Sequence, residues 1–205
     1  MAKIKLTKGE LKKQRDALKQ YERFLPTLQL KKQQLQMEIL KQSSALEMRK
    51  RDEESKTNGA QIWAGLLTDE TPDIRQWVNP KRTHLSYKNI AGTDIPVIEK
   101  IDFEYPEYDL FATPLWVDAA IETLKAITSL REEIATIEYG INILRQELRV
   151  TTQRVNLFEK VKIPEAEEAI RRIKIYIGDQ MANAVGRSKI AKRKIDEAML
   201  EEVAA

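Results

Sequence analysis

Apolar residues in the last third of the chain recur every seven positions. One row runs through Ile127, Ile134, Ile141, Leu148 and Val155, and a second row three residues further on runs through Leu130, Ile137, Leu144, Thr151 and Phe158. Nine of these ten positions are apolar in a chain with 42% hydrophobic residues, and chance would give that in a fixed register about 0.3% of the time. A seven-residue repeat keeps one apolar seam of a helix against a partner helix. The pattern therefore predicts a long helix that pairs with another.

A looser ladder of the same period occupies the first quarter of the chain. Its apolar positions are Leu11, Leu18, Tyr21, Leu25, Leu28, Leu35, Ile39 and Leu46, interrupted by Gln14, Lys32 and Gln42. Good helix formers dominate residues 3–57, which are predicted to form one helix that stops at Asn58-Gly59. Pro26 lies inside it. Because Leu25 is a poor N-cap, we expect a kink there and not a break.

The composition of the chain changes between residues 58 and 115, which contain five of the seven prolines. Residues 84–90 alternate polar and apolar side chains, residues 91–94 read as a turn, and residues 95–103 resume an extended pattern. This arrangement predicts a β-hairpin, with Pro96 near a strand start or at an edge. Residues 60–68 are expected to form a short helix. The three tryptophans are expected to fill a small core in this segment: Trp63, Trp77 and Trp116.

A second long helix is predicted to start near Pro114 with Thr113 as its N-cap. Pro164, followed by glutamates, either kinks this helix or starts a fresh one. The predicted fold is mainly α: a long antiparallel two-helix coiled coil, built from segments 1–57 and 116–205 and kinked near 164, with a small middle module (58–115) that contains the hairpin. The predicted seam consists of Leu11, Leu18, Leu28, Leu35 and Ile39 on one side, and Ile127, Ile134, Ile141, Leu148 and Val155 on the other.

Charge placement tells more than the net charge of +3. Residues 1–20 carry seven basic and two acidic side chains, and residues 187–197 carry five basic and two acidic ones. In an antiparallel pair both segments would come together at one tip, where they either bind a partner or are solvated helix ends. The candidate contact residues at this tip are Lys5, Lys8, Arg187, Lys192 and Arg193.

Sites for chemistry are not expected in this chain. It has no cysteine and one histidine, His84, which argues against thiolate or histidine-rich metal sites and favours a reducing, intracellular compartment. The acidic runs at 52–54 and 132–133 point in different directions around a helix and are expected only to solvate it. No apolar run approaches the ~18 residues of a membrane span, and residues 1–20 lack the features of a secretory signal. We predict no catalytic, cofactor or metal site and no direct membrane insertion.

Residues 154–164 read Arg-Val-Asn-Leu-Phe-Glu-Lys-Val-Lys-Ile-Pro, and residues 169–177 read Ala-Ile-Arg-Arg-Ile-Lys-Ile-Tyr-Ile. This order resembles the C-terminal signature of the D subunits of V-type (archaeal/vacuolar-type) ATPases. Residues 31–35 and 89–96 also resemble that family, so the resemblance covers almost the whole chain. Gly178 and Gly186 stand where an acidic-basic stretch is usual, which suggests a divergent bacterial branch.

The resemblance implies a central-stalk rotor axle without catalytic chemistry of its own. Its paired terminal helices would insert into the ring formed by the A and B subunits of the catalytic head. Its lower part would bind the F subunit of the central stalk and seat on the membrane-ring cap subunit (C/d type). The protein would then act on the cytoplasmic side of the membrane, as a peripheral part of a membrane-bound complex that moves protons or sodium ions.

Two other classes of protein also fit a basic coiled coil with a hairpin. A prefoldin-like chaperone joins coiled-coil helices through β-hairpins, but its arms need apolar tips to hold clients, and these tips are basic. An RNA-gripping arm would bind nucleic acid in a salt-sensitive way. The aromatic residues lie far from the basic ends, so no nucleic-acid partner is predicted.

Overall fold

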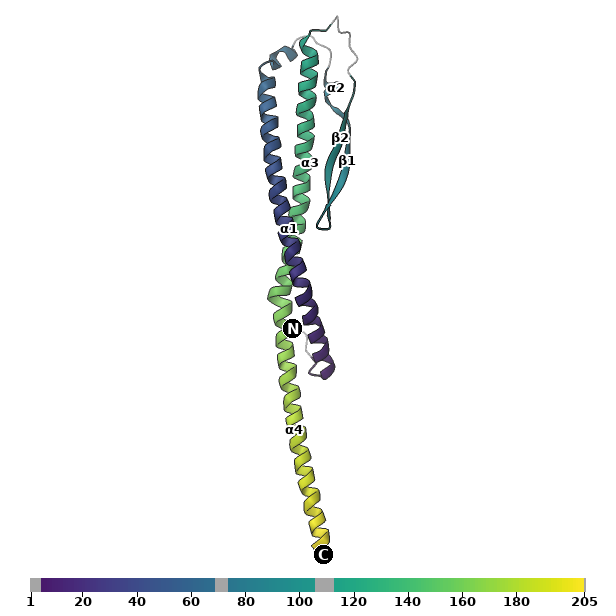
Figure 1. Cartoon of the computed structure of the whole chain (residues 1–205), viewed down its shortest axis with the longest axis vertical. Helices are drawn as coiled ribbons and strands as arrows, with labels where there is room; N and C mark the ends of the chain where they lie inside the picture. The colour runs from purple at the N-terminus through teal and green to yellow at the C-terminus, as the bar shows by residue number, and fades with distance from the viewer. Residues whose placement is uncertain (1–4, 69–73, 106–112, 205) are drawn as a thin grey trace. The chain divides into compact units, whose positions relative to one another are not determined.

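The computed structural model describes residues 5–68, 74–105 and 113–204. Its elements are helix α1 (Lys8–Gln61), the 3₁₀ turn η1 (Ala64–Thr68), helix α2 (Arg75–Val78), strands β1 (Pro80–Ile90) and β2 (Thr93–Phe103), helix α3 (Trp116–Leu157), the π-helical turn η2 (Phe158–Lys162) and helix α4 (Ile163–Ala204), shown in Figure 1. They divide into two compact units. We call residues 1–29 with 153–205 the terminal unit, and residues 30–152 the central unit. The predicted fold class, mainly helical with one hairpin, is confirmed.

Helix α1 starts at a capped end and continues beyond its predicted stop. The Thr7 hydroxyl accepts a hydrogen bond from the Glu10 backbone N–H at 3.3 Å, which satisfies one of the free donors of the first turn. Pro26 lies within the helix and does not break it. The predicted end at Asn58-Gly59 is wrong, because Gly59 does not adopt the left-handed conformation of a helix cap and the helix runs to Gln61. Ala60, just beyond this glycine, is buried, so the last turn packs against the fold.

The backbone also stays helical through Pro164. The Ile163 N–H donates to the Phe158 carbonyl, a bond of π-helical span, and Ile163 itself has helical dihedral angles of −66° and −54°. A proline has no N–H to give to the carbonyl four residues earlier. The wider π turn lies directly before the proline, as is usual where a helix absorbs an irregularity. Of the two alternatives at this position, the structure therefore has a continued helix.

The hairpin forms as predicted, with longer strands and a tighter turn. The strands pair antiparallel from Ile90 opposite Thr93 to Pro80 opposite Phe103. Ala91 and Gly92 form the two-residue turn with φ values of 52° and 78°, the conformation that matches the twist of paired strands. The Asn89 side chain braces this turn, since its Oδ1 accepts from the Gly92 N–H and its Nδ2 donates to Asp94.

We expect Gly92→Ala to destabilise the hairpin by about 1 kcal/mol, because an alanine at positive φ is strained even though no atom would lie within 4 Å of the new methyl group. Thermal unfolding of the full chain measures this change. Gly59→Ala is the matched control. Its Cβ also meets nothing within 4 Å, but it sits in a helix, so the same methyl group should raise stability by up to ~1 kcal/mol. Equal effects of the two substitutions would contradict this explanation.

Two apolar clusters hold the central unit together. The first joins Ile74 and Trp77 to Val117 and Ile121 of α3, with Trp116 packed at its edge. The second joins Leu35 of α1, Leu144 of α3 and Ile95 of β2. The hairpin lies alongside α3 (Figure 1), and a Cβ on Gly140 would stand 3.8 Å from the Cβ of Ile95. The hairpin therefore covers one face of the α1/α3 pair.

Candidate functional site

The predicted seam is divided between the two units. In the central unit Leu35, Ile127 and Ile141 are buried, whereas Ile39, Ile134 and Leu148 are half-buried. In the terminal unit Val155 is buried, and the three leucines of α1 are half-buried: Leu11, Leu18 and Leu28. All ten side chains are thus at least partly removed from water, and the α3 side is the better covered.

Several buried seam positions were not among the predicted ones. Leu144 is fully buried, and its place in the second row of the α3 ladder is the signal that points to it. On α4 the buried residues are Ala166, Ala169, Ile170 and Ile173. Their spacing continues a seam beyond Pro164. Because two of these four residues are alanines, a search for large apolar residues does not detect this seam.

Four ion pairs join α1 to α3 within the central unit. The distances are 2.6 Å for Lys31–Glu147, 3.1 Å for Arg49–Glu133, 2.6 Å for Lys50–Glu138 and 2.9 Å for Arg131–Glu53. Residue numbers broadly rise on α1 as they fall on α3, so the two helices run antiparallel. Each pair is partly exposed and contributes at most ~1 kcal/mol. Their main effect is to favour one register of the seam over its neighbours.

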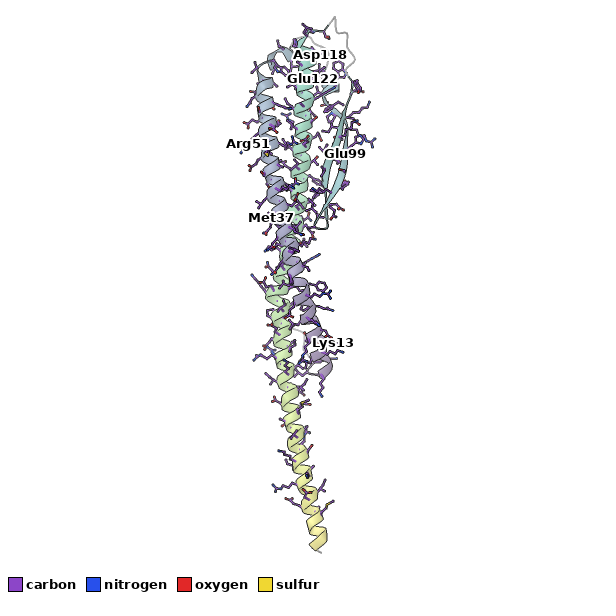
Figure 2. All side chains as sticks on the ribbon, in the orientation of Figure 1. Lys13, Met37, Arg51, Glu99, Asp118 and Glu122 are labelled. Atoms are coloured by element: carbon purple, nitrogen blue, oxygen red, sulfur yellow. The ribbon has the colours of Figure 1, made fainter. Side chains whose placement is uncertain are left out.

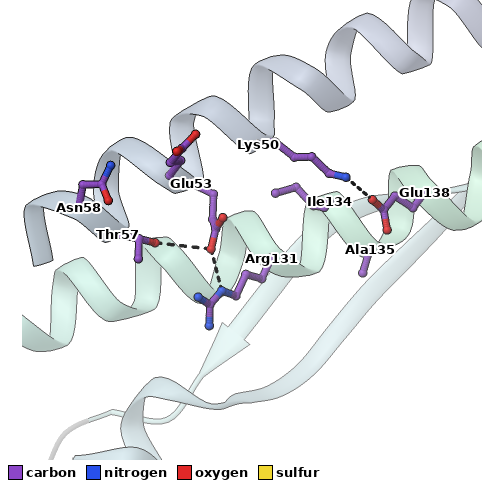
Figure 3. Close-up of a pocket in the computed structure, with 9 residues that line it drawn as sticks. Lys50, Glu53, Thr57, Asn58, Arg131, Ile134, Ala135 and Glu138 are labelled. Atoms are coloured by element: carbon purple, nitrogen blue, oxygen red, sulfur yellow. Dashed lines mark hydrogen bonds and ion pairs between the residues drawn. The ribbon is translucent and has the colours of Figure 1, made fainter. Parts of the chain in front are cut away.

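Figure 3 shows the depression between α1 and α3 where two of these pairs lie. Lys50 reaches Glu138, and the Glu53 carboxylate accepts from both Thr57 and Arg131. The carboxylates of Glu53 and Glu138 are each matched by a cation, which is typical of a structural contact and not of an acid–base pair. The acidic runs at 52–54 and 132–133 each contribute one such partner, Glu53 and Glu133.

The single histidine lies on the exposed hairpin. His84 Nε2 is 2.9 Å from Asp102 Oδ2, and Lys100 Nζ is 2.7 Å from the other carboxylate oxygen. The hydrogen bond from Lys100, helped by His84, lowers the pKa of Asp102, and the same contact raises the pKa of Lys100. The strand pairing shifts register between His84 and Leu85. The cluster therefore ties the two strands together beside an irregularity.

Of the predicted tip residues, Lys5 and Lys8 lie at the beginning of α1, and the other three lie on α4: Arg187, Lys192 and Arg193. Burial along α4 ends at Ile173, and between residues 174 and 199 no described side chain is buried. Within the terminal unit, α4 extends past the beginning of α1 (Figure 1). From residue 174 to 204 α4 is about 45 Å long, at ~1.5 Å per residue.

The uncovered part of α4 combines cations with apolar side chains. Arg187, Lys192 and Arg193 are exposed, and Arg193 pairs with Glu197 at 2.9 Å. The exposed large apolar residues of this part are Ile175, Tyr176, Met181, Val185, Ile190, Ile195 and Met199. A single helix with such a surface is marginal in water by itself. The composition suits a helix that is covered by a partner.

Just before this segment, one carboxylate of α4 forms ion pairs with two arginines of the same helix. Glu168 pairs with Arg171 and Arg172, each at 2.8 Å. The hydrogen bonds from these arginines, Arg171 first, lower the pKa of Glu168 to about 2. The side chains lie on one exposed face of α4. They stabilise the helix locally and leave a net charge of one cation on this face.

Neither of two further kinds of site is found in the described residues. No group of three or more histidine, cysteine, aspartate or glutamate side chains is placed to hold a metal ion. None of the helices there combines the length and the apolar character needed to cross a bilayer.

Comparison with known proteins gives a consistent result over nearly the full length. The family model for the D subunit of ATP synthase matches residues 10–193. The V-type ATP synthase D subunit of Borreliella burgdorferi is 44% identical over 195 residues, which cover 95% of this chain and 96% of the relative. The V-type ATP synthase D subunits of Chlamydia caviae and Chlamydia abortus are 33% and 32% identical over 202 residues, covering 96% of this chain and 95% of each relative.

Proposed function

The chain belongs to the family of ATP synthase D subunits, and on that premise we propose that it is the non-catalytic central rotor shaft of a V-type ATPase or ATP synthase. In this role it couples ATP hydrolysis or synthesis in the catalytic head to ion translocation in the membrane. The observation that carries the proposal is the match to V-type relatives along 95% of the chain. The family match gives no support to a prefoldin-like chaperone.

The geometry of the terminal unit favours a shaft. A rotating axle needs a stiff body and an end that a surrounding ring can grip. In this unit α4 has buried residues up to Ile173, and the predicted seam leucines of α1 are half-buried. The Tyr21 ring of α1 packs against the Phe158 ring in a tilted arrangement, with the ring centroids 5.3 Å apart. Beyond Ile173 α4 continues as a lone helix with exposed apolar and basic side chains. We propose that this lone segment is the bearing inside the ring of A and B subunits.

The proposed contact residues on the head side are Arg187, Lys192 and Arg193. Lys5 and Lys8 lie near the start of α1, and within the terminal unit they would meet a lower part of the ring than the α4 residues do. We propose that the central unit binds the central-stalk F subunit and the membrane-ring cap subunit. The protein itself would stay on the cytoplasmic side of the membrane, and protons or sodium ions would pass through other subunits.

Co-expression with the A, B and F subunits of the same organism tests the proposal. We expect a complex that purifies with this chain in a fixed stoichiometry and whose ATPase activity drives rotation of a probe attached to the chain. Omission of the chain should leave A and B without a rotor. The proposal is wrong if the chain never enters such a complex under conditions in which A and B assemble.

A further inference from the structure

The apolar ladder of α3 does not by itself fix the register of this helix against α1. Its first row repeats an isoleucine or a leucine every seven residues over 127–148. A slip of α3 by one heptad replaces each member of the row by the next, so the seam stays apolar after the slip. Leu35 packs with Leu144, and after a slip it would face Ile137 or Thr151. The register is therefore decided by contacts that do not repeat every seven residues.

Three of the four ion pairs between α1 and α3 gather within five residues of α1. We call them the charge cluster: Arg49–Glu133, Lys50–Glu138 and Glu53–Arg131. Figure 3 shows the last two in the depression between the helices. All three pairs are attractive in the observed register. The charges of α3 do not repeat every seven residues at these places, so the cluster distinguishes one register from its neighbours.

A slip that brings later residues of α3 to the cluster is opposed by two repulsions. In this slip, which we call the forward slip, each α1 residue meets the α3 residue seven places further on. Lys50 would then face Arg145, and Glu53 would face Glu138. The remaining arginine of the cluster would face a glycine. Like charges brought together between two helices disfavour that arrangement.

The backward slip, in which each α1 residue meets the α3 residue seven places earlier, is opposed less strongly. Lys50 would face Arg131, which is again a like charge. The other two α1 members of the cluster would face Leu124 and Ala126, which are uncharged. Both slips thus remove all three attractions, and Lys50 meets an arginine in either direction.

We propose that Lys50 and Glu53 set the register of α1 against α3 and that the charge cluster resists the forward slip more strongly than the backward one. Exposed ion pairs add little to total stability, but they discriminate well between arrangements that bury similar apolar surface. In a shaft the register has a mechanical consequence, because a helix pair that slides along its seam relieves a torque instead of transmitting it. That consequence rests on the proposed function, whereas the register is a property of the chain alone.

The test exchanges the two charges on α1. Lys50→Glu combined with Glu53→Lys keeps the net charge of the chain. Both exchanged side chains would face like charges in the observed register, and both would face opposite charges after the forward slip, at Arg145 and Glu138. We therefore expect the exchange variant to populate the forward-slipped register while it keeps its helical circular dichroism signal.

Spin labels on the full chain report the register. The chain has no cysteine, so Met37→Cys and Glu122→Cys give two unique labelling sites at exposed positions of α1 and α3, both marked in Figure 2. Double electron–electron resonance measures the distance between the labels. Without the exchange we expect a single distance. The exchange variant should add a second one that is roughly 10 Å longer, since the forward slip carries Glu122 seven residues further from Met37, at ~1.5 Å per residue.

A compensating exchange on α3 and a control on α1 make the result specific. Arg131→Glu with Glu138→Lys, added to the exchange on α1, restores opposite charges in the observed register and should restore the single distance. Glu47→Arg with Arg51→Glu is the matched control. Both residues are exposed and neither belongs to the four pairs that join α1 to α3, so this variant should keep the single distance.

Three outcomes overturn the proposal. They are an unchanged single distance or a loss of helical signal in the exchange variant, a second distance that is shorter and not longer, and a compensated variant that fails to regain the single distance. None of them depends on assembly with other subunits. A chain whose register responds as expected but which never joins A and B subunits would instead overturn the proposed function alone.

Discussion

Leu144→Asp is expected to unfold the central unit. Leu144 is fully buried, where it packs with Leu35 of α1 and Ile95 of the hairpin. Truncation of such a leucine alone costs about 2–5 kcal/mol, and a carboxylate in its place adds the cost of burying an unpaired charge. The sum approaches the total stability of a typical domain, about 5–15 kcal/mol. We expect the melting temperature, followed by circular dichroism, to fall by more than ~10 °C.

Tyr139→Asp provides the control on the same helix. It introduces the same side chain five residues earlier, at a position that is 62% exposed, and should change the melting temperature by no more than ~2 °C. The variant Leu144→Met separates volume from charge, because a methionine preserves the apolar contact and should cost less than ~1.5 kcal/mol. A stable Leu144→Asp chain with intact helical signal would show that the cluster of Leu35, Leu144 and Ile95 does not hold the unit together.

The strength of the sequence pattern decides how well each element can be predicted. The α3 ladder has one polar member, Thr151, so its seam face is unambiguous, and Ile127, Ile141 and Leu144 are buried. The hairpin is equally predictable, because Ala91-Gly92 lies between two alternating segments and a two-residue turn admits few conformations. Both patterns involve residues that are close in the sequence, so the elements that they predict depend little on contacts with distant parts of the chain.

Helix α1 shows the opposite case. Its ladder is interrupted by Lys32 and Gln42, while Leu30, Met37, Leu40 and Met48 form a second row of similar strength. Two apolar rows on one helix do not say which row faces the intrachain partner. For this reason the sequence alone does not reveal which row the fold leaves exposed. Only the packing of α3 on one row shows that the other is uncovered.

Helix ends and the relative offset of distant segments are the weakest predictions. Gly59 favours a stop because glycine readily adopts the left-handed cap, yet buried Ala60 extends the helix past it. The two basic segments would lie side by side only if α1 begins and α4 ends at the same level of the helix pair. The composition of residues 174–204 favours a helix. It does not indicate how much of that helix pairs with the first residues of the chain.

Truncation of the chain after Gly178 should separate stability from function. No described side chain between residues 174 and 199 is buried, so the truncation removes no buried side chain among the described residues 179–199. We expect a melting temperature within ~2 °C of the full chain. The same truncation removes all of the proposed bearing except residues 174–178. Binding to the assembled A and B subunits, measured by light scattering or calorimetry, should weaken by at least ~10-fold, since exposed apolar and arginine side chains carry most of the energy of such contacts.

A second set of variants distinguishes the contribution of charge to this binding from the contribution of apolar contacts. The triple variant Arg187→Glu, Lys192→Glu, Arg193→Glu keeps the full helix and its exposed apolar residues while it reverses three cations. If the head grips α4 through complementary charge, this variant should bind as weakly as the truncated chain at low salt and recover part of its binding as salt screens the repulsion. If the exposed apolar residues of α4 dominate the contact, the triple variant should bind nearly as the full chain does, whereas Val185→Glu combined with Ile195→Glu should not. Full binding and coupled rotation by the truncated chain would place the bearing outside residues 179–205, because a segment that can be removed without effect transmits no torque.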